Sequence, residues 1–178
     1  MRTRGFTLIE LLVVLGVTTL LASGAILYGS TSRKQTTLYI ESAKLSQAIL
    51  GAKSQAVRTY YDPNVISCGY GIRVDRPARA YALFNYVVEN AADCTNVTDV
   101  PDSSYVEVER TPLNSGIVFT EDETAIRDIL FIPPDPTTLM WTEDGLVADD
   151  TAPFILATDD GSAESRITVN KRGQVSFR

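Results

Sequence analysis

RGFTLIELLVVLGV, residues 4–17, places one carboxylate, Glu10, inside a run that is otherwise uncharged after Arg4. A carboxylate in an apolar segment is costly, and such a residue usually faces a partner group rather than lipid. The eighteen residues Leu11–Tyr28 carry no charge, which is just long enough for a membrane-spanning helix. Because Arg2 and Arg4 precede this run, the positive-inside rule places the N-terminus in the cytoplasm and the rest of the chain outside.

The helical pattern continues beyond this run. No proline occurs before Pro63, and apolar residues recur three and four positions apart, on one face of an amphipathic helix. These residues are Leu45, Ala48, Ile49, Ala52 and Ala56. The sequence therefore predicts one long helix from about Thr7 to about Tyr60. Its first half would lie in the membrane, and its second half would pack on a globular domain.

Past Pro63 the sequence changes to short runs rich in β-branched and aromatic residues, with turn residues between them at fairly regular spacing. The runs are 65–74, 80–88, 105–110, 116–119, 129–132, 138–141, 154–158, 166–170 and 174–177. This pattern is typical of antiparallel sheets. We therefore expect an α+β fold, in which a long N-terminal helix packs on a mainly antiparallel β-domain.

Two of the runs carry more specific signals. In YVEVER (105–110) the valines alternate with the glutamates, which places the two kinds of side chain on opposite faces of a strand. RITVNKRGQVSF (166–177) indicates a closing hairpin with its turn at residues 170–173. The domain should therefore end on two paired strands.

The charges are divided unequally between the two parts of the chain. Residues 1–60 hold seven basic and two acidic residues, whereas residues 61–178 hold nine basic and twenty acidic ones, a net charge of -11. An acidic body repels phosphate, which makes nucleic-acid binding an unfavourable role. The chain has no histidine, so it lacks the commonest general base and the commonest metal ligand. We expect no catalytic residue, no metal site, no cofactor and no enzymatic activity.

Three interpretations of the N-terminal run compete. A secretory signal peptide would use the basic start, the apolar core and the small residues Ala22–Ala25 as its cleavage region. A plain membrane anchor would need only the apolar length, and neither of these two interpretations uses Glu10. In the third, RG followed by FTLIELLVVLGV resembles the type III signal of type IV pilins and pseudopilins. That signal combines a short basic leader, a glycine, a phenylalanine and a glutamate at the fifth mature residue.

The resemblance implies that prepilin peptidase cleaves between Gly5 and Phe6, and that Phe6 is then N-methylated. Cleavage creates an α-amine on Phe6 that is charged near neutral pH. In the family, the glutamate is thought to meet the N-terminal amine of a neighbouring subunit, so Glu10 is expected to act in subunit assembly. Breaking one half of a buried ion pair costs about 3–5 kcal/mol, far more than an exposed pair contributes.

The order of elements resembles that of the GspH/FimT-type pseudopilins, which have a small-residue-rich stem helix and a two-sheet β-domain. The resemblance implies a leader (1–5), a transmembrane half (6–28) and an amphipathic half (29–60) of the helix, and a globular β-domain (61–178). It implies a single-pass inner-membrane protein, with its globular domain extracytoplasmic, that is later built into a pilus or a type II secretion pseudopilus. Its partners would be other pilin or pseudopilin subunits, prepilin peptidase, the inner-membrane assembly platform and the membrane itself.

Cys68 and Cys94 are the only cysteines in the chain. In an exported domain two cysteines indicate one disulfide, whereas in the cytosol they would be free thiols. Since the N-terminus indicates export, we expect the disulfide. On the chain-entropy model, closing this interval would stabilise the fold by roughly 3–4 kcal/mol.

Two other functions compete with a structural pilin. Some FimT-type proteins are associated with DNA binding through a basic C-terminal stretch, and a competence pilin of this kind would bind DNA during uptake. The corresponding residues here would be Arg166, Lys171, Arg172 and Arg178. The net charge of the body argues against DNA as a partner. The other alternative is an exported adhesin with a cleaved signal peptide and no filament.

Overall fold

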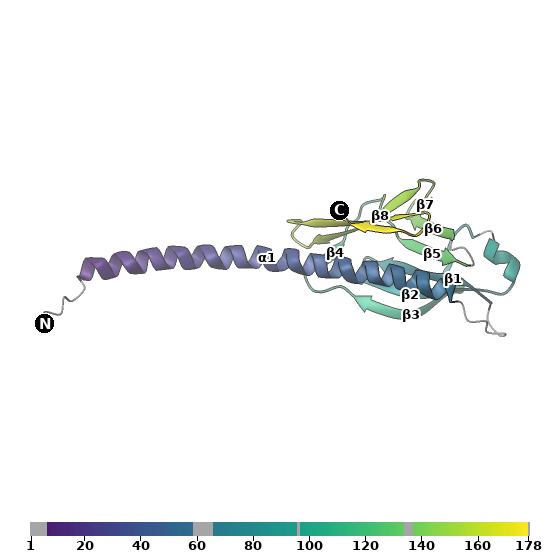
Figure 1. Ribbon diagram of the computed structural model, residues 1–178, viewed down its shortest axis with the longest axis horizontal. Coiled ribbons are helices and arrows are strands. Elements are labelled where there is room, and N and C mark those ends of the chain that lie inside the picture. The colour runs from purple at the N-terminus through teal and green to yellow at the C-terminus, as the bar shows by residue number, and fades with distance from the viewer. Residues whose placement is uncertain (1–6, 59–65, 96, 134–136, 178) are drawn as a thin grey trace. The chain divides into compact units, whose positions relative to one another are not determined.

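The structure is a computed structural model that describes residues 7–58, 66–95, 97–133 and 137–177, without the side chains of residues 25–31. The chain divides into two compact units, Met1–Thr36 and Thr37–Arg178. One helix, α1 (Leu8–Val57), contributes residues to both units. Its bounds agree with the single long helix that the sequence predicts, and it is labelled α1 in Figure 1.

In the first unit, the described side chains of residues 7–24 belong to the helical segment that the sequence predicts to enter the membrane, and those of residues 32–36 follow it. No helix among the described residues is long and apolar enough to cross a membrane. The predicted span, 11–28, continues into residues 25–31, whose side chains lie outside the described set.

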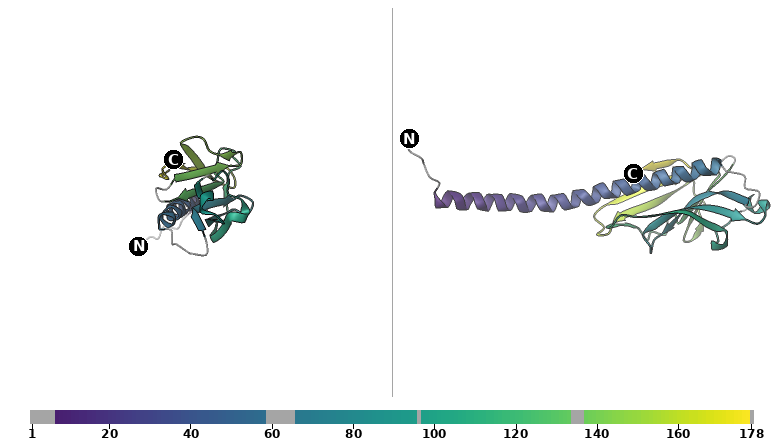
Figure 2. Two further views of the ribbon diagram at one scale, coloured as in Figure 1. Left: turned by 90° about the vertical axis from the view of Figure 1, so that its right-hand side faces the viewer. Right: turned by 90° about the horizontal axis from the view of Figure 1, so that it is seen from below.

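In the second unit, α1 supplies one face to the core. Leu45, Ile49, Ala52 and Ala56 are fully buried, and Ala48 is partly buried against the same cluster. The 3.6-residue period that predicted this face is therefore confirmed. Figure 2 shows the strands gathered along this part of α1.

Ten strands form two antiparallel sheets in the described part of the second unit, so the expected α+β fold with two sheets is confirmed. The larger sheet has the order β3-β2-β1-β5-β6-β7. Its strands are β1 (Ile66–Asp75), β2 (Ala80–Val88), β3 (Tyr105–Pro112), β5 (Asp128–Ile132), β6 (Thr137–Thr142) and β7 (Gly145–Leu146). The smaller sheet has the order β10-β9-β8-β4. Its strands are β4 (Ile117–Phe119), β8 (Thr151–Thr158), β9 (Glu164–Asn170) and β10 (Val175–Phe177).

Side chains on the two faces of the larger sheet enter two separate cores. Ile129, Phe131 and Met140 join α1 and the smaller sheet in the first core. Leu130 and Trp141 are their immediate neighbours in sequence, and they lie in a second core with Phe84 and Tyr86. Because successive side chains of a strand point to opposite faces, the second core lies on the face turned away from α1.

The edge strand β3 departs from the alternation expected for it. A β-bulge shifts the register between Leu83 and Phe84 of β2, so that Val108 of β3 has no partner in the ladder. Val106 and Val108 are both about half exposed. The bulge, the glutamates on the strand and Pro112 at its end are devices that protect an edge from pairing with another chain.

The closing hairpin is confirmed. β9 and β10 pair antiparallel, and their turn is closed by a hydrogen bond from Gly173 N to Asn170 O at 2.7 Å. Gly173 has a φ of 65°, which glycine adopts without strain. The turn therefore lies where the sequence placed it.

Candidate functional site on the stem helix

The first turn of α1 is capped by its own side chains. Thr7 N donates to Glu10 Oε2 at 3.2 Å, and Thr7 Oγ1 donates to the same oxygen at 3.1 Å. In return, Glu10 N donates to Thr7 Oγ1 at 3.3 Å. This reciprocal arrangement is a capping box, which satisfies backbone groups that the first turn leaves unpaired. Glu10 thus has a partner within its own chain.

The expected cleavage site, Gly5 and Phe6, lies outside the described residues. The structure therefore shows Glu10 and the start of the helix, but not the amine that cleavage would create. The prepilin motif alone does not predict the cap, although the sequence contains a signal for it. Thr-x-x-Glu before an apolar run is the pattern of a capping box.

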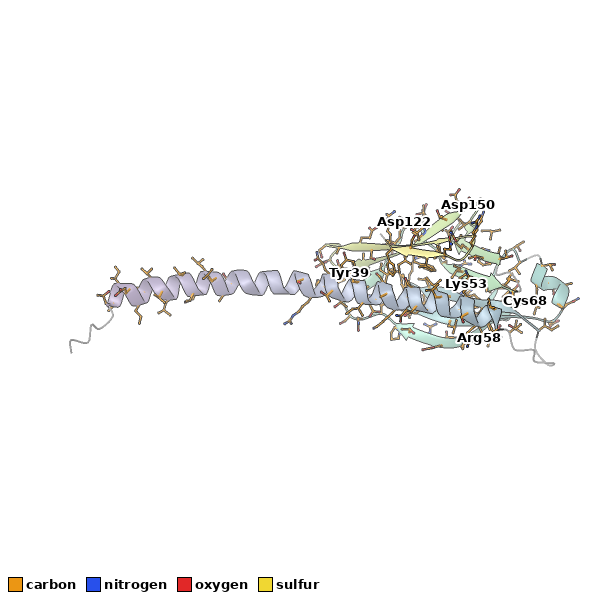
Figure 3. The ribbon with its side chains drawn as sticks, in the orientation of Figure 1. Tyr39, Lys53, Arg58, Cys68, Asp122 and Asp150 are labelled. Atoms are coloured by element: carbon orange, nitrogen blue, oxygen red, sulfur yellow. A yellow bond between two sulfur atoms is a disulfide. The ribbon has the colours of Figure 1, made fainter. Side chains whose placement is uncertain are left out.

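Apolar side chains surround the first turns of α1 on all sides. Ten of them between Leu8 and Leu21 are at least half exposed, and they are drawn in Figure 3. They are Leu8, Ile9, Leu11, Leu12, Val13, Val14, Leu15, Val17, Leu20 and Leu21. Since consecutive helical residues lie about 100° apart, this set leaves no polar face. A helix that is apolar all round is stable only when lipid or other apolar helices cover it.

The part of α1 in the second unit has an outward face without charge, which we call the uncharged face. At about 100° per residue, its members fall within roughly one quarter to one third of the helix surface. They are Tyr39, Ile40, Ala43, Gln47, Leu50, Ser54 and Val57, and all seven are exposed. The exposed fractions of Tyr39, Leu50 and Val57 are 70%, 50% and 57%. Charged residues usually cover the solvent face of a helix, so an uncharged one indicates a contact surface.

Lys53 joins α1 to the closing hairpin within the second unit. Its Nζ donates to the carbonyl oxygens of Arg172 at 2.7 Å and of Gly173 at 3.2 Å. A Cβ at Gly173 would lie 3.1 Å from this Nζ and 2.8 Å from the ring of Phe131. The glycine thus permits both the turn and the close approach of the helix.

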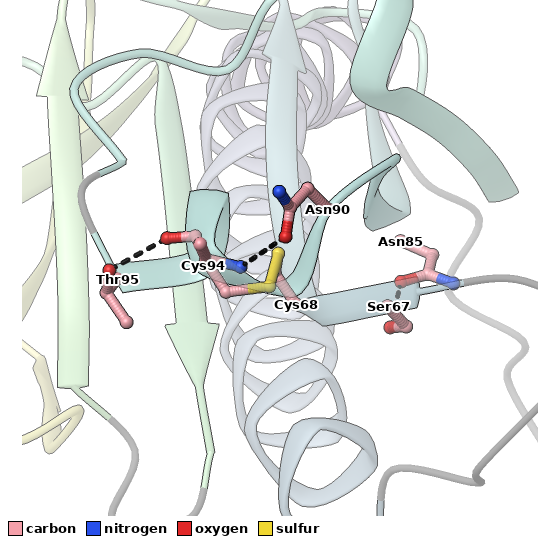
Figure 4. Close-up of a disulfide and its surroundings, with 7 residues drawn as sticks. Ser67, Cys68, Asn85, Asn90, Cys94 and Thr95 are labelled. Carbon is pink, nitrogen blue, oxygen red and sulfur yellow. Dashed lines mark hydrogen bonds between the residues drawn. A yellow bond between two sulfur atoms is a disulfide. The ribbon is translucent and has the colours of Figure 1, made fainter.

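The predicted disulfide between Cys68 and Cys94 is confirmed. Cys68 lies on β1, and Cys94 lies in the short 3-10 helix η1 (Ala91–Thr95), with their Cα atoms 5.2 Å apart. Figure 4 shows the bridge between the two elements. Cys68 is buried in the second core, and Cys94 packs against that core.

The basic C-terminal residues do not form one free patch. Arg166 Nε donates to Glu164 at 2.7 Å, and this contact raises the pKa of Arg166. Lys171 Nζ donates to the carbonyl of Ala148. Arg166 and Lys171 are five residues apart along an extended strand and turn, which separates them by roughly 16 Å. Arg172 is exposed at the turn, and Arg178 lies outside the described residues. No observation on the described residues favours a nucleic-acid site here.

A cavity of about 400 Å³ beside β1 gathers four arginines, Arg73, Arg76, Arg110 and Arg127. Each is already paired with an acidic side chain, so none of these four guanidinium groups is left unpaired. The hydrogen bonds of Arg110 to Glu107 and Asp75 raise its pKa. Burial opposes the charge of Arg73, but its contacts with Asp128 and Asp102 outweigh that cost and raise its pKa.

Asp128 is the buried centre of this charged cluster. Its side chain is fully buried and accepts from Arg73 Nε at 2.7 Å and from Arg127 Nε at 2.8 Å. The Arg73 guanidinium also lies over the ring of Tyr105, 4.4 Å from its centre. Burial and the Glu107 carboxylate raise the pKa of Tyr105 to about 12. The cluster therefore joins neighbouring strands rather than presenting a reactive group.

Among the described residues, no group of three or more histidine, cysteine, aspartate or glutamate side chains is arranged to hold a metal ion. The turn between β8 and β9 is closed by its own atoms, since Ser162 N donates to Asp160 Oδ1 at 3.1 Å. The described residues thus offer exposed surfaces on α1 and side-chain contacts that hold the strands and the helix together.

Residues 1–26 match the model of the prokaryotic N-terminal methylation motif. The chain therefore carries the signal of type IV pilin-like proteins, which prepilin peptidase processes. Proteins of this class are structural rather than enzymatic, and they associate with other pilin subunits. No curated protein and no solved structure matches the chain.

Proposed function

We propose that this protein is a minor pilin or pseudopilin, a structural subunit of a type IV pilus or of a type II secretion pseudopilus. Prepilin peptidase removes residues 1–5, and Phe6 becomes the methylated N-terminus. Residues 6–28 anchor the subunit in the inner membrane, with the N-terminus cytoplasmic and the globular domain outside. The assembly platform then transfers the subunit into the filament.

The uncharged face of α1 carries this proposal. The solvent face of a helix is usually covered by charged residues, yet this face has none from Tyr39 to Val57. The apolar side chains of Leu8–Leu21 on the same helix also need cover. Helices of neighbouring subunits supply apolar cover without requiring charged partners. The stem would thus be the surface through which subunits pack.

Within this class, we assign the chain to the GspH/FimT-type pseudopilins. The assignment is supported by the order of elements, a stem helix followed by two antiparallel sheets and a closing hairpin. In the filament, Glu10 would exchange its contact with Thr7 for the Phe6 amine of a neighbouring subunit. We do not propose DNA uptake, because the basic C-terminal residues are dispersed and partly paired.

A charge placed on the uncharged face tests the proposal. Leu50→Glu should leave the fold intact, because Leu50 is exposed, but it should abolish crosslinking to filament neighbours. Gln55→Glu is the matched control, since Gln55 is exposed on the same helix outside the uncharged face. Both variants should reach the membrane fraction in normal amounts. Normal filament incorporation of Leu50→Glu would contradict packing through this face.

A further inference from the structure

The described residues between β2 and β3, 89–95 and 97–104, form a lid over the second core. Below it lie Phe84, Leu130 and Trp141, which are almost completely buried. The lid contains η1 and a second short 3-10 helix, η2 (Asp102–Ser104), and neither has a buried residue. Among the described lid residues, only Val97 and Val100 are buried apolar side chains. Two valines give little hydrophobic stabilisation against the entropy lost by ordering a segment of this length.

The noncovalent ties of the lid combine partly buried hydrogen bonds with exposed ion pairs. Trp141 Nε1 donates to Thr98 O at 2.7 Å, and Arg73 donates to Val100 O at 2.7 Å. Asp99 and Asp102 form ion pairs with arginines of the sheet, but their side chains are 63% and 97% exposed. Exposed ion pairs contribute little to stability. A further tie is covalent, the bond between Cys94 of the lid and Cys68 of β1.

We propose that the Cys68–Cys94 disulfide is a redox-sensitive switch that keeps the lid closed over the second core. A dithiol reductant breaks the S–S bond by supplying two electrons and two protons, leaves two thiols, and becomes a disulfide itself. The lid then opens and exposes the face of the larger sheet on which Trp141 lies, while α1 and both sheets stay folded around the first core. The two cores lie on opposite faces of the larger sheet, so the second can open without the first. The closed lid is thus restricted to an oxidising compartment.

Trp141 reports on the lid directly, because it is the only tryptophan in the chain and contacts the lid through Thr98. The experiment uses the full chain in detergent, before and after complete reduction by excess dithiol and alkylation of both thiols. Reduction should shift the tryptophan emission to the red and raise acrylamide quenching toward that of an exposed indole. The sheet signal in circular dichroism should not change. Cys94→Ser should reproduce the reduced state without reductant.

Asp99→Asn is the control, because it removes an exposed ion pair of the lid and leaves the disulfide intact. It should keep the emission of the oxidised protein. Unchanged emission after complete reduction would overturn the proposal, since the lid would then close without the bond. Loss of tryptophan burial and sheet signal together would also overturn it, because the lid would not be an independent part. Opening by Asp99→Asn would equally contradict it, because the ion pair rather than the disulfide would then hold the lid.

Discussion

Among the described residues Glu10 contacts Thr7, and we propose that it gains a second partner from a neighbouring subunit. In the single subunit it completes the capping box with Thr7. A lost cap costs about 1 kcal/mol, whereas an unpaired buried charge costs about 3–5 kcal/mol. The exchange of Thr7 for a neighbour's amine is therefore favourable once both charges are buried in a filament. An unassembled subunit keeps its carboxylate satisfied until then.

Substitutions at Glu10 and Thr7 separate these two roles. Glu10→Ala and Glu10→Gln should leave cleavage and membrane insertion intact but prevent incorporation, because the neighbour's amine loses its charged partner. Glu10→Asp should be partly tolerated, since its carboxylate is one methylene short. Thr7→Val, which removes the hydroxyl of the cap and keeps the Glu10 charge, should still assemble. Crosslinking to filament neighbours measures incorporation. Normal assembly of Glu10→Ala would contradict the pairing role and show that the glutamate has another function.

Asp128 and Asp102 both pair with Arg73, but only Asp128 is buried. Asp128→Asn should lower the free energy of unfolding by about 3–5 kcal/mol, because two partly buried arginines lose their shared counter-charge. Asp102→Asn should change it very little, since Asp102 is almost fully exposed. Urea unfolding followed by the fluorescence of Trp141 measures both. Equal effects of the two substitutions would contradict a buried charged cluster.

At the scale of helices and strands, the sequence predicts those features that depend on local periodicity and turn residues. The buried face of α1 follows from apolar spacing, and the closing hairpin follows from its turn residues. The exposed face of β3 did not follow from its alternation, because the bulge at Val108 depends on pairing with β2. β7 has only two residues, too few to produce a pattern. Strand register and the position of edge strands depend on which strands become neighbours, and the periodicity of the sequence carries no information on that pairing.

Close packing between strands gives the larger sheet a specific requirement for glycine at Gly71. A Cβ there would lie 2.1 Å from the carbonyl oxygen of Ile129 and 2.6 Å from the ring of Phe84. Gly71→Ala should therefore destabilise the fold by at least about 1–3 kcal/mol through overpacking. Gly51→Ala on α1, where nothing lies within 4 Å, should instead stabilise it by about 0.5–1 kcal/mol. Denaturant midpoints measure both, and tolerance of Gly71→Ala would show that these strands can separate.

The candidate site was predictable where a motif defines it and not where tertiary contacts define it. Glu10 and the cleavage site follow from the N-terminal motif, and the disulfide follows from two cysteines in a chain marked for export. The uncharged face of α1 emerges only when the buried side of the helix is known, because its small, polar and apolar residues form no motif. The dispersal of Arg166 and Lys171 likewise depends on the contacts of each side chain.

The chain joins an acidic β-domain to a helix whose exposed apolar surfaces need cover. The β-domain protects its edge strand β3 with a bulge, charges and a proline, which disfavours assembly through strand pairing. The exposed apolar and uncharged surfaces lie on α1 instead. Subunits would therefore associate through their stems, and the acidic domains would face solvent.

The decisive measurement is the mass of the N-terminal peptide of the native protein. A pilin-like subunit should begin at Phe6 and carry one methyl group on its α-amine, because prepilin peptidase cuts after Gly5. A chain that begins near Gly24 or Ile26 would show cleavage of an ordinary signal peptide, and one that keeps Met1 would show no processing. Either result would contradict the assignment of this protein as a pilin-like subunit.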